Sequence, residues 1–248
     1  MGIFDLSGKR ILVTGASSGI GRACAIMAAQ LGASVILTGR RADALDGVVA
    51  VLHGEGHQSV VGDIASECFL DELVSKCGKV DGLVHAAGVA PMCPIGFVGL
   101  EQVQSVMNVN YLAFLQLMKR YSRQKNRSAN FSAVAISSVS AFVGWGGGTV
   151  YCGSKGALSA SVRALALELS SKNIRVNAVC PSNIKTPMYE RGAAEMNDAE
   201  SEKKLISRQP LGLGVPEQVA APVCFLLSDA ASFITGVNLP VDGGYLAQ

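Results

Sequence analysis

The segment Val13-Thr-Gly-Ala-Ser-Ser-Gly-Ile-Gly21 decides the fold of this chain of 248 residues. It follows a short β-branched run and precedes an alanine-rich helical pattern. Gly15 permits a tight turn, Gly19 permits a ligand to approach the backbone closely, and Gly21 lets the helix pack on the strand. Such a turn presents backbone N–H groups and the helix dipole to a phosphate. The segment therefore predicts a dinucleotide-binding βαβ unit, with further contacts from Ser17, Ser18 and Ile20.

Short β-branched runs alternate with longer helical patterns along the rest of the chain. The expected strands are residues 10–14, 34–38, 59–62, 82–85, 133–137, 175–179 and 237–239, and the expected helices are residues 19–31, 42–53, 68–76, 101–125, 151–172 and 217–227. Several of these strands are apolar throughout, as strands covered on both faces are. The alternation predicts an α/β fold with a doubly wound, parallel, seven-stranded Rossmann-like sheet and helices on both faces. Because no repeat or linker divides the chain, we expect a single domain over residues 1–248.

Composition excludes several classes of protein. The chain is 49% hydrophobic and 16% charged, which is typical of a globular protein. Its net charge of +2 is small and its basic residues are dispersed, so we expect no nucleic-acid partner. The seven cysteines form no CxxC pair, which favours free thiols in a reducing compartment. No signal peptide is visible, and the charge-free stretch 128–154 contains serines and glycines that favour a buried strand and loop over a membrane span. We expect a cytoplasmic protein without a membrane partner.

Tyr151 and Lys155 stand four residues apart in Tyr-Cys-Gly-Ser-Lys, with Ser138 thirteen positions before the tyrosine. On a helix, positions i and i+4 share a face, so the ammonium group can lie beside the phenol. A free tyrosine has a pKa of about 10, and a neighbouring cation lowers it. A phenol adjusted in this way can donate a proton to a carbonyl or accept one from an alcohol.

The end of the second strand indicates which nicotinamide cofactor is bound. An acidic residue there would bind the ribose 2′-hydroxyl and repel a 2′-phosphate. This chain has Leu37-Thr-Gly-Arg-Arg41 instead, and Arg40 and Arg41 offer donors that suit a phosphate. The alternative is that both arginines only begin a solvated helix. The sequence favours NADP(H) over NAD(H).

The motifs in their order resemble the short-chain dehydrogenase/reductase family over the whole chain, in its single-domain branch of about 250 residues. The resemblance is to members like 3-oxoacyl-[acyl-carrier-protein] reductase. Its motifs are the Thr14–Gly21 loop, Asp63, Ala86-Ala-Gly88, Asn110, Ser138, Tyr151 to Lys155, Val176-Asn-Ala-Val-Cys-Pro181, Thr186 and Val241-Asp-Gly-Gly244.

The resemblance implies a role for each matching residue. Tyr151 is the catalytic acid/base, and Lys155 lowers its pKa and hydrogen-bonds the nicotinamide ribose. Ser138 hydrogen-bonds the substrate oxygen, and Asn110 holds a water that links Lys155 to solvent. Contacts to the cofactor are implied for Asp63 and Ile64 at the adenine, for Ile184 and Thr186 at the carboxamide, and for Ala87, Gly88 and Pro181.

Several of these residues have other interpretations. Asn110 could cap or kink its helix, Ser137 could be the active serine if the register slips by one residue, and Thr186 could be a turn residue only. Two positions depart from the family pattern. Ala86 stands where the family often has asparagine, and Ser182 stands where it usually has glycine. Ser182 could be strained at positive φ, or it could add a polar contact near the nicotinamide.

Three other features have a functional and a structural interpretation. His53 and His57 have a metal-binding spacing but no third ligand, so we expect no metal. Cys152 could be a redox-sensitive thiol, but packing is the simpler interpretation. The charge-rich segment 188–208 is either a solvated helix pair or a mobile lid over the substrate.

The substrate is expected to be a small carbonyl or alcohol. The leading hypothesis is an NADPH-dependent carbonyl reductase, and reduction of a 3-oxoacyl thioester is one candidate reaction. That reaction would need a basic surface for an acidic carrier protein, which could be formed by Arg120, Arg123, Lys125 and Arg127. The same residues could instead simply be the cationic end of a helix. The alternatives are a dehydrogenase of a sugar, polyol or steroid-like alcohol, or a non-catalytic NADP(H)-binding sensor or scaffold. The resemblance also implies a homotetramer, or a dimer. Residues expected near the substrate are Pro91, Met92, Phe142, Val143, Trp145, Met188 and Tyr189.

Overall fold

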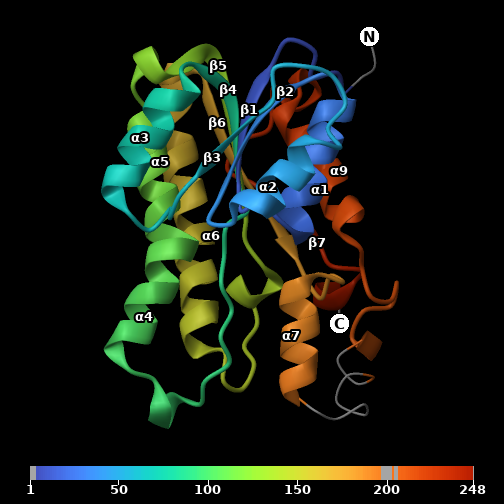
Figure 1. The fold of residues 1–248 in the computed structure, drawn as a ribbon. Coiled ribbons are helices and arrows are strands. Elements are labelled where there is room, and N and C mark those ends of the chain that lie inside the picture. Colours follow the sequence, from blue (N-terminus) through green and yellow to red (C-terminus); the bar gives the residue numbers. More distant parts are fainter. Residues whose placement is uncertain (1–3, 197–202, 204–205, 248) are drawn as a thin grey trace.

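The computed structural model describes residues 4–196, 203 and 206–247, and its strands form one parallel sheet (Figure 1). The order of the seven strands is β3-β2-β1-β4-β5-β6-β7. Their bounds are β1 Arg10–Thr14, β2 Ser34–Gly39, β3 Gln58–Val61, β4 Val80–His85, β5 Arg127–Ile136, β6 Ile174–Pro181 and β7 Asn238–Val241. The predicted fold class, a doubly wound parallel sheet of seven strands, is confirmed.

Helices cover both faces of the sheet. One face is covered by α1 (Gly19–Gln30), α2 (Ala42–Val49) and α9 (Pro216–Leu227), and the other by α3 (Glu67–Cys77), α5 (Ala113–Tyr121) and α6 (Thr149–Leu169). The helix α4 (Leu100–Met107) packs against α6 and extends beyond the sheet. The strands β1, β2, β4, β5 and β6 contribute to both layers because their side chains alternate: in β2, Leu37 packs into the first core, and Ile36 packs into the second. Burial of these apolar side chains on both faces is the main stabilising contribution.

The strand order places a crevice at the carboxyl ends of β1 and β4. From β1 the chain continues to β2 and β3 on one side, and it returns to β4 on the other side of β1. The loops that follow these two neighbouring strands therefore diverge, which is where ligands bind in doubly wound sheets. A further helix, α7 (Pro187–Met196), follows β6 and lies beyond this edge of the sheet (Figure 1).

Three of the expected elements differ clearly from the structure. The helix expected at 42–53 ends at Val49, because a turn with Gly54 and Gly56 at φ of 96° and 78° follows. The helix expected at 101–125 consists of α4, a π-helical turn at Asn108–Leu112, and α5. The strand expected at 133–137 begins earlier, at Arg127, where it joins β4 across a register shift.

Within the described residues, none of the helices is both long enough and apolar enough to span a lipid bilayer. The charge-free stretch 128–154 forms most of β5, a loop and the first turn of α6. The predicted strand and loop are therefore present.

Candidate active site

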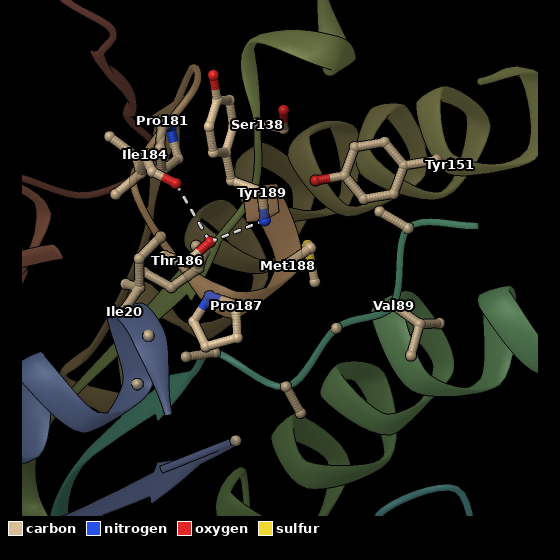
Figure 2. A pocket seen from close by; sticks show the side chains of 18 of the residues that line it. Ile20, Val89, Ser138, Tyr151, Pro181, Ile184, Thr186, Pro187, Met188 and Tyr189 are labelled. Carbon is tan, nitrogen blue, oxygen red and sulfur yellow. Dashed lines mark hydrogen bonds between the residues drawn. The ribbon is translucent and has the colours of Figure 1, made fainter. Parts of the chain in front are cut away.

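A cavity of about 1030 Å³ opens at the carboxyl ends of the central strands. Its walls come from the loops after β1, β2, β3, β4, β5 and β6 and from the first turns of α7. At one end lie Arg40 and Arg41, and at the other lie Ser138, Tyr151 and Lys155. Figure 2 shows the second end, where Ser138 and Tyr151 lie opposite Thr186, Pro187 and Met188. All of the expected site residues except Asn110 line this cavity, and Asn110 is buried directly behind it.

The glycine-rich turn fits a dinucleotide because side chains are sterically excluded from it. Gly15 has φ of +66°, and a Cβ there would come within 2.7 Å of the Ala87 backbone. Gly19 has φ of +54° and faces Thr186, whose Cγ2 would lie 3.2 Å from an added Cβ. A Cβ on Gly21 would overlap the backbone of Gly15. Bare backbone thus faces the cavity at the start of α1, where N–H groups and the helix dipole favour a pyrophosphate.

The end of the cavity near β2 carries positive charge. Arg41 donates a hydrogen bond from Nη2 to Ser17 Oγ at 3.2 Å, and both Arg40 and Arg41 are exposed. Asp63 and Ile64 line the cavity after β3, as expected, and Asp63 accepts the Ala65 N–H through Oδ1 at 2.9 Å. Two guanidinium groups beside a serine hydroxyl form a set of donors that suits a phosphate.

Ser138 and Tyr151 meet at the other end of the cavity. Ser138 Oγ accepts the N–H of Ser140 at 3.0 Å, so its own proton remains to be donated. The Ser138 hydroxyl also lies close enough to the phenol of Tyr151 to lower its pKa. Ser137 points elsewhere, since its Oγ lies 2.7 Å from Ser159 Oγ and 3.2 Å from the Lys155 carbonyl. The structure therefore favours Ser138 over Ser137 as the serine that meets a substrate.

Lys155 is buried and anchored beside Tyr151. Its Nζ donates to the carbonyl of Ile136 at 2.8 Å and lies 5.7 Å from the centroid of the Tyr151 ring. Gly88 borders the same space, because a Cβ there would lie 3.7 Å from Lys155 Nζ and 3.4 Å from Asn110 Oδ1. The lysine, the asparagine and the turn after β4 thus converge behind the phenol.

Asn110 lies in the π-helical turn and joins three segments. Its Oδ1 accepts the Val89 N–H at 2.8 Å, while its Nδ2 donates to the Val89 carbonyl and to Ser154 Oγ, each at 2.9 Å. The widened turn and these contacts agree with the alternative that Asn110 distorts its helix, and they place it beside Lys155 as well. A π-turn of this kind is frequent at functional sites.

The pKa values of Tyr151 and Lys155 are set mainly by burial. Burial raises the pKa of Tyr151 to about 12, and the hydrogen bond from Ser138 partly opposes this increase. Burial lowers the pKa of Lys155 to about 8. Burial thus sets the net pKa of the phenol in this arrangement, and the expected lowering by Lys155 stays a prediction. The penalty for burying a phenolate outweighs the attraction of an ammonium group whose own charged form burial also disfavours.

The loop after β6 builds the opposite wall. Thr186 Oγ1 donates to the carbonyl of Ile184 at 3.2 Å and accepts the Tyr189 N–H at 3.2 Å (Figure 2). Thr186 thereby caps the first turn of α7 while it lines the cavity with Pro181 and Ile184. Ser182 is not at positive φ, and its hydroxyl donates to the Asp242 carbonyl at 2.9 Å. Ser182 is thus unstrained and ties this loop to the C-terminal segment.

The substrate end of the cavity differs partly from the expectation. Met92, Val143, Trp145, Met188 and Tyr189 line it, whereas Pro91 and Phe142 do not. Sequence reasoning also missed other lining residues, among them Ser140, Asn183 and Tyr245. Tyr245 is close to the C-terminus, and nothing in its local sequence indicates that the chain returns there.

The other candidate features have structural explanations. His57 Nδ1 accepts the Val35 N–H at 3.1 Å, and its Nε2 lies 3.0 Å from the His53 carbonyl, so this pair clamps a loop. In the part of the chain that the structure describes, no three His, Cys, Asp or Glu side chains gather as metal ligands would. Cys152 Sγ contacts the Val143 carbonyl at 3.8 Å. The first part of the 188–208 segment forms α7 and lines the cavity, whereas 197–202 and 204–205 lie outside the described residues.

Curated proteins of similar sequence cover nearly the whole chain. The L-rhamnose 1-dehydrogenase (NAD(P)(+)) of Sphingomonas sp. is 36% identical over 96% of this chain and 96% of its own length. The L-xylulose reductase of Mus musculus is 36% identical over 98% of both chains. The 3-oxoacyl-[acyl-carrier-protein] reductase of Thermotoga maritima is 34% identical over 96% of this chain and 98% of its own.

A solved structure and a family model agree with these relatives. A putative NAD(P)-dependent gluconate 5-dehydrogenase from Beutenbergia cavernae, solved with bound NADP, is 33% identical with a TM-score of 0.87 and full coverage of both chains. The family model described as enoyl-(acyl carrier protein) reductase matches residues 15–246. With its fold and its cavity, this chain belongs to the short-chain dehydrogenase/reductase family and is an NAD(P)-dependent oxidoreductase that acts on CH–OH and C=O groups.

Proposed function

We propose that this protein is an NADP(H)-dependent reductase of a small carbonyl compound and, in the reverse direction, a dehydrogenase of the matching secondary alcohol. One observation carries the proposal: Ser138, Tyr151 and Lys155 converge at one end of a cavity whose other end holds Arg40 and Arg41. The first set handles the proton of a substrate oxygen, and the second recognises a phosphate. The proposal treats residues 1–248 as one domain.

NADP(H) is favoured over NAD(H) by the charges around the second strand. Ser17, Arg40 and Arg41 would hold the ribose 2′-phosphate, and Arg41 already donates to Ser17. Asp63 and Ile64 would border the adenine. Gly15, Ser18, Gly19, Ile20 and Gly21 would surround the pyrophosphate, while Ala87, Gly88, Pro181, Ile184 and Thr186 would line the nicotinamide side. When bound, the cofactor supplies or accepts the hydride.

The protein side chains handle the oxygen and its proton. At neutral pH the phenol of Tyr151 holds its proton, because burial raises its pKa to about 12. It can therefore donate that proton to the oxygen of a carbonyl as negative charge develops there. The Ser138 hydroxyl would turn its proton from the phenol to the same oxygen and stabilise it. Lys155 and Asn110, behind the phenol, would replace the proton through a bound water.

The charge pattern of the surface disfavours an acyl carrier protein as the source of substrate. Of the four basic residues that could bind an acidic carrier, Arg120 and Arg127 are buried. Arg120 donates to Asp71 Oδ1 at 2.8 Å, and Arg127 donates to backbone carbonyls of residues 128, 129 and 172. Relatives that are named for rhamnose, xylulose and gluconate add weight to the sugar or polyol alternative. A non-catalytic sensor would have no use for the convergence of these proton-handling groups.

A homotetramer or a dimer is part of the proposal. Leu112 beside α5 and Leu167 on α6 are exposed, as is Phe233 just before β7. Apolar side chains of this size on the surface favour contact with a second copy. The free cysteines favour a cytoplasmic location.

Oxidation of NADPH and NADH with a panel of carbonyl compounds tests the proposal. The panel contains ketopentoses, unsubstituted ketones, diketones and a 3-oxoacyl thioester. NADPH-selective turnover of a ketone supports the proposal, and turnover of the thioester alone would redirect it to acyl substrates. A preference for NADH would show that Arg40 and Arg41 do not bind a 2′-phosphate.

A further inference from the structure

Trp145 forms one wall of the cavity next to the tyrosine that we propose as the acid. Its ring centroid lies 6.3 Å from that of Tyr151, with the two planes 52° apart. The indole lines the cavity and is 39% exposed, a large apolar surface to leave facing water. Burial of an aromatic face of this size is favourable, so a ligand that covered the indole would gain free energy from the contact.

The indole is fixed in place rather than loosely disposed on the loop. Its Nε1 donates a hydrogen bond to Ser140 Oγ at 3.2 Å, and the N–H of Ser140 in turn donates to Ser138 Oγ at 3.0 Å. The ring packs on the backbone at Gly148, where a Cβ would overlap the indole atoms. The loop itself is held to its neighbour, since Gly147 accepts the Cys93 N–H at 2.9 Å. The orientation of the ring is therefore linked to the serine of the reaction.

These contacts decide what the indole can offer to a ligand. Because its single N–H is used by Ser140, the ring can contribute a face and an edge but no hydrogen bond. A π-face attracts polarised C–H groups, and those of a hydroxylated carbon chain are polarised by their oxygens. The polar residues Ser140 and Asn183 also line the cavity and would offer hydrogen-bond partners to hydroxyls on the same chain. An aromatic platform beside hydroxyl and amide groups suits a polyhydroxylated chain better than a wholly apolar one.

We propose that Trp145 is a specificity-determining residue, a stacking platform that selects ketoses and their alcohols. This inference rests on the proposed function, since it assigns the substrate class of the same site. The indole lies against the C–H face of the carbon chain while the carbonyl oxygen meets Ser138 and Tyr151.

Fluorescence tests the platform without relying on turnover, because Trp145 is the only tryptophan in the sequence. A Tyr151→Phe variant saturated with NADP⁺ is titrated with a ketopentose and, separately, with 2-pentanone. We expect the ketopentose to change the intensity or wavelength of the emission in a saturable way and at lower concentration than 2-pentanone. An emission that ignores the ketopentose, or responds more readily to 2-pentanone, overturns the proposal.

Kinetics supply the second test, with Phe142→Ala as the matched control. Phe142 is an exposed aromatic residue of the same segment that does not line the cavity. We expect Trp145→Ala to lower kcat/KM for the ketopentose about tenfold relative to 2-pentanone, with Trp145→Phe retaining most of the preference. The control should leave the ratio unchanged.

The outcomes separate the platform from the underlying function. Equal losses on both ketones in Trp145→Ala would overturn the platform and leave the proposed reductase standing. Wild-type turnover of 2-pentanone but not of the ketopentose would likewise overturn the platform alone. Failure of wild-type protein to reduce any carbonyl, together with a silent emission, would overturn both.

Discussion

The ammonium group of Lys155 donates a hydrogen bond of 2.8 Å to the backbone carbonyl of Ile136. The acceptor stands two residues before Ser138, at the end of β5. The end of one strand therefore positions both the serine that we place at the substrate oxygen and the lysine behind the phenol. The anchor also uses one of the three donor positions of the ammonium group, which leaves the others for a ribose or a water.

The first prediction concerns the effect of pH on carbonyl reduction. Because burial lowers the pKa of Lys155 to about 8, its positive charge is lost as pH rises through that value. We expect kcat/KM for reduction to fall on the alkaline side with an apparent pKa of about 8. In Lys155→Arg the guanidinium stays charged across this range, so the alkaline decrease in kcat/KM should disappear. The variant should also be slower than the wild type at every pH. An identical alkaline limb in the variant would contradict the assignment to Lys155.

The second prediction separates two adjacent serines. Ser138→Ala removes the donor to the substrate oxygen, and we expect kcat to fall by a factor of about 100 to 1,000. Ser137→Ala removes contacts to Ser159 and the Lys155 carbonyl, so it should lower stability by about 1 kcal/mol with a much smaller effect on kcat. Steady-state kinetics and urea unfolding of both variants distinguish these effects. A larger kinetic loss in Ser137→Ala would reverse the assignment.

The third prediction concerns the choice of cofactor. Arg40→Ala and Arg41→Ala each remove a guanidinium that we place at the 2′-phosphate. We expect KM for NADPH to rise about tenfold or more in each variant, while KM for NADH stays nearly constant. Lys76→Ala is a suitable control, because that cation pairs with Glu72 on the exposed side of α3. Parallel changes for both cofactors would show that the arginines do not recognise the phosphate.

The fourth prediction is a dependence of stability on pH that arises from His85. This side chain is fully buried, its Nδ1 lies 3.2 Å from Thr14 Oγ1, and burial followed by the charge of Lys155 lowers its pKa to about 3. The unfolded chain binds a proton near pH 6.5 and the folded chain does not, so acid favours unfolding between pH 6.5 and about 3.

Urea unfolding of the wild type and of His85→Asn, measured at several pH values, checks this dependence of stability on the protonation of His85. As the pH falls from about 6 to about 4.5, the free energy of unfolding should decrease in both proteins. The decrease per pH unit should be about 1.4 kcal/mol larger in the wild type than in the variant. Equal slopes would show that His85 is protonated in the folded protein.

The strands and most helices could be predicted from the sequence because their apolar patterns are local. The run from Arg10 to Thr14 carries its own strand pattern, and the glycines after it carry their own turn chemistry. The π-helical turn at Asn110 could not be predicted, because it accompanies contacts to Val89 and Ser154 that are distant in sequence. Tyr245 enters the cavity for the same kind of tertiary reason.

The pKa values of the site residues were less predictable from the sequence than the identity of those residues. The i, i+4 spacing correctly placed Lys155 beside Tyr151, but the depth of burial of the two side chains decides their pKa values. Spacing along a helix contains no information about desolvation, which depends on the whole packed structure.

The central claim is that Tyr151 transfers the proton to the carbonyl oxygen, and Tyr151→Phe tests it most directly. The variant keeps the aromatic ring and loses only the hydroxyl. Reduction of the best ketone with NADPH should fall by a factor of about 100 to 10,000, while the Kd for NADPH, measured by fluorescence titration, stays within about twofold. Turnover close to that of the wild type, with cofactor binding intact, would contradict the account.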